Sequence, residues 1–231
     1  STVLLPQYMQ LSMGYTAEQA GMALSPGGFA VILLLPMVGA LVSRVDARYL
    51  IGFGFLILSL SMFYMTSHLY AQIDFKHVML LRVYQSAGLA FLFVPINQVV
   101  YNGVPLEKNN AVSGIVNLSR NMGGDIGIAF VTTMIARRAQ LHQTTLVAHA
   151  TPYDPGFTAS LARISAGLEH AGVAAPEAIT RATAILYRQV IGQATTLAYL
   201  DVLWMLAVST LLMIPLLLLT RKASGPPKAA H

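Results

Sequence analysis

Long apolar runs, separated by short polar connectors, dominate the pattern of this chain. A helix needs about 20 residues to cross the hydrocarbon core of a bilayer, and four or five runs qualify. The pattern predicts membrane-spanning helices over residues 22–42, 50–66, 78–101, 111–136 and 197–220. Prolines inside three of these runs are tolerated where neighbouring groups satisfy the freed carbonyls. The expected fold class is therefore an all-α integral membrane protein.

The start of the chain reads as the last turns of an apolar helix. Residues 1–8 contain neither an initiator methionine nor a charged region, so they do not form a signal peptide. We interpret this segment as a helix cut at its beginning, and the sequence as a piece of a longer protein.

The stretch between the last two apolar runs is long but patterned. Apolar residues recur at helical spacing over 157–171 and 175–191, and Pro176 suits the first turn of the second helix. These features predict a helical hairpin, which either caps the bundle or docks an extracytoplasmic partner. The organisation expected is a bundle over 1–136, a long periplasmic loop over 137–196, a last span over 197–220 and a tail over 221–231.

The connectors differ in charge, which predicts the orientation. Residues 43–48, 103–110 and the tail after Thr220 carry basic residues, and an even number of spans separates each from the next. The positive-inside rule therefore places these connectors and the C-terminus in the cytoplasm. Arg137 and Arg138 lie on the opposite side, against a strict count.

Composition supports the membrane reading and excludes other classes. The 231 residues are 55% hydrophobic and 10% charged, with a mean hydropathy of +0.63, whereas soluble domains average about 25% charged residues. The net charge of +5 forms no basic stripe of the kind that binds nucleic acid. There is no cysteine and no metal-ligand spacing among the six histidines, so no metal, cofactor or thiol chemistry is expected. A membrane-embedded enzyme would need a His/Asp or Ser/Lys constellation, and none is evident.

Charge inside the fourth apolar run is the strongest functional signal. Arg120 and Asp125 lie five positions apart, so they do not pair with each other on one helix face. A charge at membrane depth costs about 2.5–3.5 kcal/mol and usually faces a protein interior or a watery path. We expect each to seek a partner on another helix, with Asp125 as a proton-binding group; the alternative is a packing helix with permanent charge pairs. Three glycines beside them predict close helix packing, namely Gly123, Gly124 and Gly127.

Other polar residues in the spans are further candidates. Asp201, about one turn into the last span, is a second proton-coupling candidate, or else a solvated acid near the interface beside Trp204. The residues expected along a cavity or substrate path, together with Arg120, are Arg82, Gln85, Asn97, Gln98, Asn117 and Asn121.

Several segments together resemble one family, the fourteen-span drug:proton antiporters of the major facilitator superfamily, EmrB/QacA type. The segment 5–21 resembles the start of that family's C-terminal half, and 93–97 and 117–127 resemble its later helices. Residues 201–204 resemble the acid-x-x-Trp at the start of its last span, where the EmrB type carries a glutamate. A degenerate copy of the major facilitator loop motif is formed by Pro36, Gly39, Arg44, Asp46 and Arg48.

The resemblance implies the C-terminal half of a major facilitator helical bundle in the bacterial inner membrane. It implies export of lipophilic drugs against proton entry, with the N-terminal half of the same transporter, a periplasmic adaptor and an outer-membrane channel as partners. The chain departs from the family at Asp125, where a small polar residue is expected, and an extra acid there would add a proton site or favour cations. The alternatives are a major facilitator uptake symporter for a small metabolite and a non-transporting membrane scaffold.

Overall fold

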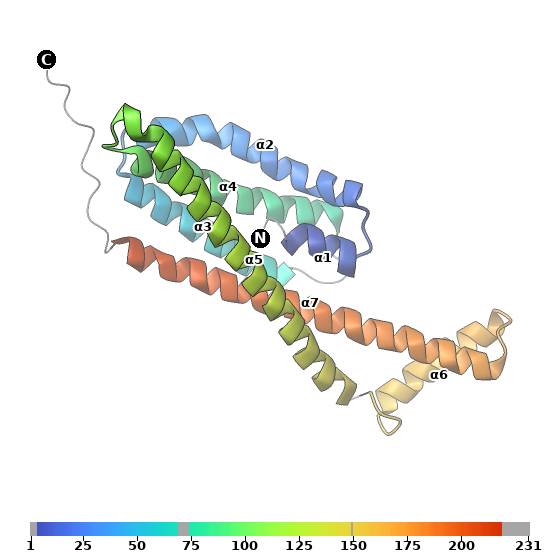
Figure 1. Cartoon of the computed structure of the whole chain (residues 1–231). Coiled ribbons are helices and arrows are strands. Elements are labelled where there is room, and N and C mark those ends of the chain that lie inside the picture. The colour runs from blue at the N-terminus through green and yellow to red at the C-terminus, as the bar shows by residue number, and fades with distance from the viewer. Residues whose placement is uncertain (1–3, 69–73, 149, 219–231) are drawn as a thin grey trace, which may run out of the picture. The chain divides into compact units, whose positions relative to one another are not determined.

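The computed structural model describes residues 4–68, 74–148 and 150–218, and these residues are helical apart from short connectors. The predicted tail over 221–231, and with it the predicted location of the C-terminus, lies outside the described residues. The elements are α1 (Leu4–Ser12), α2 (Ala17–Val42), α3 (Ala47–His68), α4 (Phe75–Tyr101), the short 3-10 helix η1 (Leu106–Lys108), α5 (Asn109–Ala148), α6 (Pro155–His170) and α7 (Ala175–Leu218). The all-α prediction is confirmed (Figure 1).

The chain divides into two compact units. The first contains the residues up to Phe130 and those from Val202 onward, and the second contains residues 131–201. Helices α5 and α7 each contribute residues to both units. The first unit therefore holds the four N-terminal helices, and the second holds the predicted hairpin.

In the first unit, α4 packs against both α2 and α3. One buried cluster includes Leu58 and Met62 of α3 and Leu92 of α4, and a second includes Val38 of α2 and Phe91 of α4. Helices α3 and α4 approach most closely at Gly88, where an added Cβ would lie 2.9 Å from the backbone nitrogen of Leu58. Small residues allow such contact where lipid supplies no hydrophobic drive between helices.

Helix α2 begins earlier than the apolar run predicts. The hydroxyl of Thr16 accepts from the Gln19 backbone at 3.2 Å, and the Gln19 side chain accepts from the Thr16 backbone at 3.0 Å. This reciprocal capping box satisfies two of the backbone donors that a helix start leaves free. The helix therefore starts at Ala17, five residues before the predicted span.

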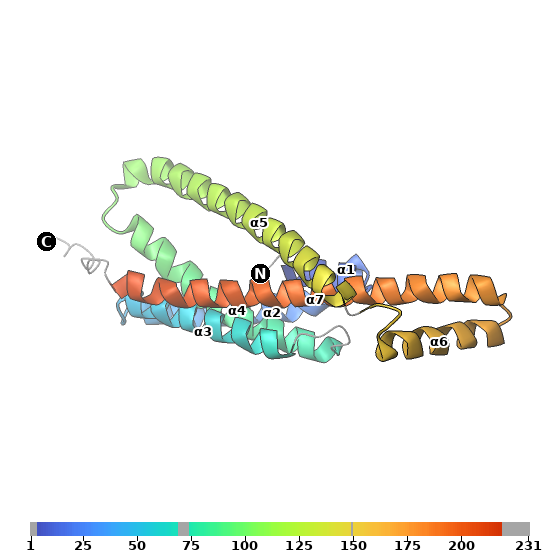
Figure 2. The same ribbon diagram turned by 90° about the horizontal axis from the view of Figure 1, so that it is seen from below.

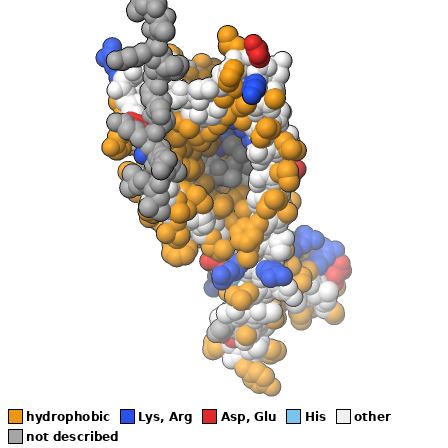
Figure 3. All heavy atoms as spheres, turned by 60° about the vertical axis from the view of Figure 1, so that its left-hand side comes forward, with side chains coloured by type: hydrophobic (Ala, Val, Ile, Leu, Met, Phe, Trp, Pro, Cys, Tyr) orange, Lys and Arg blue, Asp and Glu red, His pale blue; other side chains and the backbone are white. Residues whose placement is uncertain are grey.

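Four described helices are long and apolar enough to span a membrane: α2, α3, α4 and α7. Large hydrophobic side chains such as Phe29, Leu33 and Leu212 are exposed on them, and Figure 3 shows hydrophobic side chains over much of the visible surface. By the same measure α5 does not qualify, although it is helical throughout the predicted span 111–136. Its charges and its serine, asparagine and glycine residues lower its mean hydropathy, so its crossing of the membrane remains a prediction.

In the second unit, α6 and the first part of α7 run side by side as an antiparallel hairpin (Figure 2). Asp154 caps α6 by accepting from the backbone nitrogens of Gly156 and Phe157, at 2.7 and 3.0 Å. On α7, Ala178 and Ala182 are fully buried one turn apart, which marks the face that packs.

The predicted boundaries of the long loop need correction. Helix α5 continues to Ala148, well past the predicted end of its span, and α7 is one helix from Ala175 to Leu218. Residues 137–148 and 192–196 contain no proline to stop either helix. The hydroxyls of Thr195 and Thr196 donate to backbone carbonyls one turn earlier, so this polar segment of α7 remains helical.

Candidate functional site

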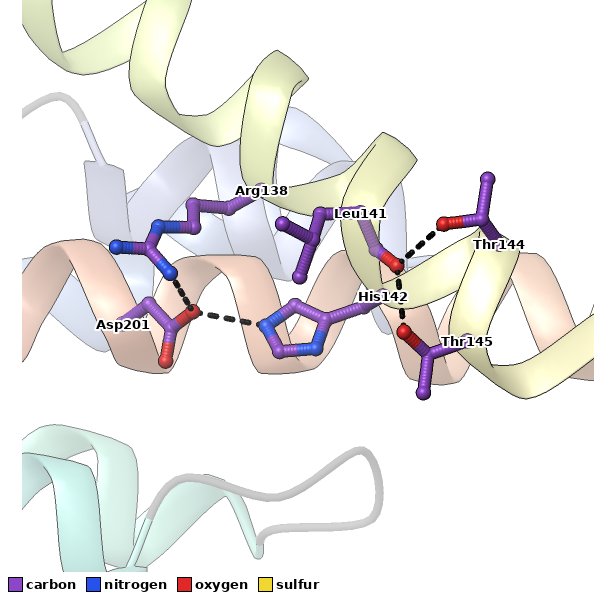
Figure 4. Close-up of polar contacts among 6 residues, drawn as sticks. All are labelled: Arg138, Leu141, His142, Thr144, Thr145 and Asp201. Carbon is purple, nitrogen blue, oxygen red and sulfur yellow. Dashed lines mark hydrogen bonds and ion pairs between the residues drawn. The ribbon is translucent and has the colours of Figure 1, made fainter.

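Three charged or titratable side chains meet in the second unit, from α5 and α7 (Figure 4). Nε2 of His142 lies 2.8 Å from Oδ2 of Asp201, and Nη1 of Arg138 lies 3.7 Å from the same oxygen. Arg138 and His142 are one helical turn apart on α5 and both point toward Asp201 on α7. The predicted candidate Asp201 therefore sits in a three-residue cluster rather than alone in solvent.

The hydrogen bond defines how this cluster can carry a proton. An ionised carboxylate only accepts hydrogen bonds, so a hydrogen lies on Nε2 of His142 when Asp201 is ionised. The guanidinium of Arg138 is cationic, and an imidazole gains one positive charge when it binds a second proton. With Asp201 ionised, the formal charge of the cluster is zero, and proton uptake by His142 makes it +1.

Local contacts on α5 hold the turn that bears His142. The hydroxyls of Thr144 and Thr145 both donate to the carbonyl of Leu141, at 2.8 and 3.0 Å (Figure 4). One residue beyond His142, Gln143 donates to the Tyr187 hydroxyl at 3.5 Å, a second polar link between α5 and α7. The side chain of His142 is 22% exposed, which leaves it within reach of water.

Sequence reasoning missed His142. Its partner lies 59 positions away, so no local motif joins them. One signal in the sequence could have indicated the cluster. Arg138 and His142 are four positions apart, so they share one face of a helix, and Asp201 lies near the start of the next predicted span.

A second group of candidates meets in the first unit. Arg120 of α5 donates from Nη2 to Oδ1 of Asn97 at 3.3 Å, and its guanidinium carbon lies 5.3 Å from the Phe93 ring centroid. Beside it is a cavity of about 410 Å³, and its lining residues are Val31, Leu89, Leu92, Phe93, Ile96 and Arg120. Arg120 thus contacts two residues of another helix and lines this cavity, and its place along a substrate path stays a prediction.

Arg82 and Gln85 also come together, deeper between α2 and α4. Nη1 of Arg82 donates to Oε1 of Gln85, which is 1% exposed. An added Cβ at Gly27 would lie 2.7 Å from Cγ of Arg82, so α2 presses closely on this side chain. The side chain of Arg82 therefore lies between α2 and α4.

The remaining candidates are not brought together by this chain. Asp125 is exposed and has no ion-pair or hydrogen-bond partner in the described part of the chain, and the polar candidates Asn117, Asn121 and Gln98 are exposed as well. Within 4 Å of a Cβ added at Gly123, Gly124 or Gly127 there is nothing, so no described helix packs on them. Among the described residues, close packing falls instead at Gly27, Gly54 and Gly88.

The predicted loop motif forms the tight connection between α2 and α3. Pro36 and Gly39 lie inside α2, and Arg44 is exposed just after the helix ends. Oδ1 of Asp46 accepts from the Arg48 backbone at 3.4 Å, across the start of α3. Over the described ranges, no group of three or more metal-ligating side chains exists.

Four helices long and apolar enough to cross a membrane, with an apolar cavity lined mainly by two of them, are typical of membrane transporters. A family model for the Major Facilitator Superfamily matches residues 1–141, more than half of the chain. The chain therefore belongs to the major facilitator superfamily, whose members are transporters rather than enzymes, and it is part of a multi-pass membrane protein.

Several proteins of known name are similar to this chain. The chain is 31% identical over 158 residues to the probable multidrug resistance protein EmrY of Escherichia coli, covering 68% of this chain and 31% of that protein. It is 28% identical over 211 residues to the multidrug export protein EmrB of Haemophilus influenzae, covering 91% of this chain and 40% of EmrB. It is 30% identical over 162 residues to the fatty acid resistance protein FarB of Neisseria gonorrhoeae, covering 70% of this chain and 32% of FarB. The chain thus spans about a third to two-fifths of the length of these relatives.

Proposed function

We propose that the chain is the C-terminal portion of a proton-driven exporter of lipophilic compounds in the bacterial inner membrane. The observation that carries this proposal is the Arg138–His142–Asp201 cluster, in which a hydrogen bond and an ion pair join two long helices. Proton uptake there changes the charge between α5 and α7, and a ligand can shift a conformational equilibrium only through such a difference between states. The names of the relatives, which refer to multidrug export and fatty acid resistance, favour export of apolar cargo.

The N-terminal half of the same transporter is the proposed neighbour of the unpacked face of α5. Transporters of this fold rock two halves about a central site, so each half presents polar and small residues to the other. The exposed glycines of α5 and the unpartnered Asp125 suit such a contact. In this proposal Asp125 is a second proton-coupling group, and Asn117 and Asn121 lie along the substrate path with Arg120.

Transport driven by a proton gradient tests the proposed function. In inverted membrane vesicles containing the full-length parent, acidification of the interior is expected to drive accumulation of radiolabelled chloramphenicol, an uncharged lipophilic compound. Vesicles without the transporter, and vesicles in which nigericin has collapsed the gradient, are the controls. Accumulation that survives nigericin would contradict proton coupling, and gradient-driven uptake into intact cells would favour the symporter instead.

The α6–α7 hairpin is the proposed docking site for a periplasmic adaptor of a tripartite system. Helix α6 has no buried residue, so its outer surface is free for a partner, and the orientation predicted from the basic connectors puts it in the periplasm, with a cytoplasmic C-terminus.

Replacing residues 155–182 with a Gly-Ser linker tests the docking proposal. This change removes α6 and the first turns of α7 but leaves His142 and Asp201 in place. The adaptor is expected to be lost when the tagged full-length transporter is purified, while chloramphenicol transport in vesicles persists. Undiminished co-purification of the adaptor would show that it binds elsewhere.

A further inference from the structure

From the cavity beside Arg120 we infer that this transporter binds lipophilic anions, with the guanidinium of Arg120 holding the anionic head and the apolar wall holding the body. This inference rests on the proposed function, because it names the class of compound that the exporter carries. It opposes the cation preference that the extra acid at Asp125 suggests.

The lining of the cavity sets the shape of the ligand. Five of the six lining residues are apolar, and they come from α2 and α4. On α4 they recur at helical spacing from Leu89 to Ile96, so they form one continuous apolar face. The volume of about 410 Å³ falls in the usual range for small-molecule pockets, about 300–1,000 Å³. Such a wall binds a hydrocarbon body and offers it no hydrogen bonds.

Arg120 supplies the polar end. No carboxylate pairs with Arg120 within the described residues; its contacts are the neutral oxygen of Asn97 and the ring of Phe93. A guanidinium has five N–H donors in a planar fork, and only one is used in the hydrogen bond to Asn97. The free donors match the paired oxygens of a carboxylate or sulfonate, which guanidinium groups bind in a bidentate way.

The described helices that surround the cavity bring no negative charge to it. Helix α4 contains no acidic residue, and the acids of α2 and α5 are Glu18 near the start of α2 and Asp125. Asp125 lies five positions from Arg120, about 140° around the helix, so it faces a different direction. Among the described residues, the charge that a ligand cation would meet at this cavity is the positive charge of Arg120, which disfavours it.

Two unsatisfied donors nearer the start of α4 also favour an anionic ligand. Nε of Arg82 and Nε2 of Gln85 are buried and have no hydrogen-bond partner in the structure. Both residues continue the helical face that bears Leu89 and Phe93, one to two turns earlier. Buried donors without acceptors are costly, and a ligand or water that brings oxygen acceptors removes that cost. This face of α4 therefore offers donors and positive charge but no negative charge.

Direct binding to the full-length transporter in nanodiscs tests the inference. The probes are radiolabelled decanesulfonate and decyltrimethylammonium, which share a ten-carbon chain and carry permanent charges of opposite sign; empty nanodiscs give the background. We expect the wild-type protein to bind the sulfonate at least about tenfold more tightly, as a charge-assisted hydrogen bond implies. Arg120→Ala is expected to abolish this preference, and Lys108→Ala, which removes an exposed charge on η1 outside the cavity, is expected to keep it.

A second variant guards against a folding defect. Arg120→Lys keeps the charge but lacks the planar fork, so it is expected to retain part of the preference for the sulfonate. Equal affinity of the wild type for both probes, or an unchanged preference in Arg120→Ala, would overturn the inference. Gradient-driven chloramphenicol transport by the wild type, measured in parallel, reports on the proposed function alone. Transport without anion preference would therefore refute only this inference.

Discussion

Replacing Asp201 with Asn is expected to abolish gradient-driven accumulation of chloramphenicol in inverted vesicles, down to the level of vesicles without the transporter. The amide keeps the shape of the side chain but removes the negative charge that His142 and Arg138 face at 2.8 and 3.7 Å. Without that charge, protonation of His142 no longer forms an ion pair between α5 and α7. The free-energy difference that couples the proton to the conformation is then lost.

Uncoupling should leave the transport path intact. Asp201→Asn is therefore expected to retain exchange of labelled for unlabelled chloramphenicol in the absence of a gradient. His142→Gln should behave in the same way, because the glutamine amide still donates to Asp201 but carries no titratable proton. A variant that loses both exchange and accumulation, with unchanged thermal stability, would count against a coupling role and favour a place on the substrate path.

A neighbouring variant separates coupling from simple helix bridging. Gln143→Leu removes the other polar link between α5 and α7, the bond to Tyr187, without removing a titratable group. It is expected to keep gradient-driven accumulation. Loss of accumulation in Gln143→Leu, as in Asp201→Asn, would show that transport only requires α5 and α7 to be held together. The proposed role of His142 would then be wrong.

Asp125→Asn in the same vesicles addresses the second proton-coupling candidate. Asp125 is exposed and has no partner among the described residues, so this variant leaves the contacts of the described helices unchanged. Loss of accumulation with retained exchange would support Asp125 as a coupling group. Accumulation equal to that of the wild type would leave coupling to the Arg138–His142–Asp201 cluster.

Gly88→Leu is expected to prevent stable packing of α3 on α4. An added Cβ already falls 2.9 Å from the Leu58 nitrogen and 3.1 Å from its Cα, so the new side chain meets backbone that cannot rotate away. Overpacking of this kind costs about 1–3 kcal/mol and occasionally more. The midpoint of unfolding of the purified transporter in SDS titrations should fall, with poor recovery after heating.

Gly21→Leu is the matched control for this substitution. Gly21 lies in α2, and nothing is found within 4 Å of an added Cβ. Both variants exchange glycine for leucine inside a helix and gain a similar helix propensity of less than about 1 kcal/mol, so the difference between them isolates the packing contribution. Equal unfolding midpoints would show that α3 and α4 can separate at Gly88 without cost.

The helices themselves could be predicted from the sequence, because hydrophobic periodicity and chain breakers act locally. The apolar runs, the hairpin start at Pro176 and the helical nature of 111–136 all follow from residues within a few turns of one another. The ends were harder to place. A capping box starts α2 earlier than its apolar run predicts. Polar segments without proline let α5 and α7 continue as helices into the predicted loop.

The residues of the candidate site could be predicted from the sequence, but their contacts could not. Sequence alone identified Arg120, Asp125 and Asp201, because a charge in an apolar run is costly and therefore conspicuous. It did not identify their neighbours. The sequence predicts close packing at the glycines of α5, whereas among the described residues close contact falls at Gly27, Gly54 and Gly88, each of which faces a neighbouring helix.

The sequence by itself determined that this chain is a helical membrane protein with isolated charges inside its apolar segments, since composition and periodicity are properties of single helices. Only the tertiary structure decided that Asp201 meets His142 and Arg138, and that Arg120 meets Asn97 and Phe93 at an apolar cavity. The physical reason is that such pairings depend on the rotation and register of one helix against another. Those are set by side-chain packing across tens of residues of intervening chain, which no local pattern records.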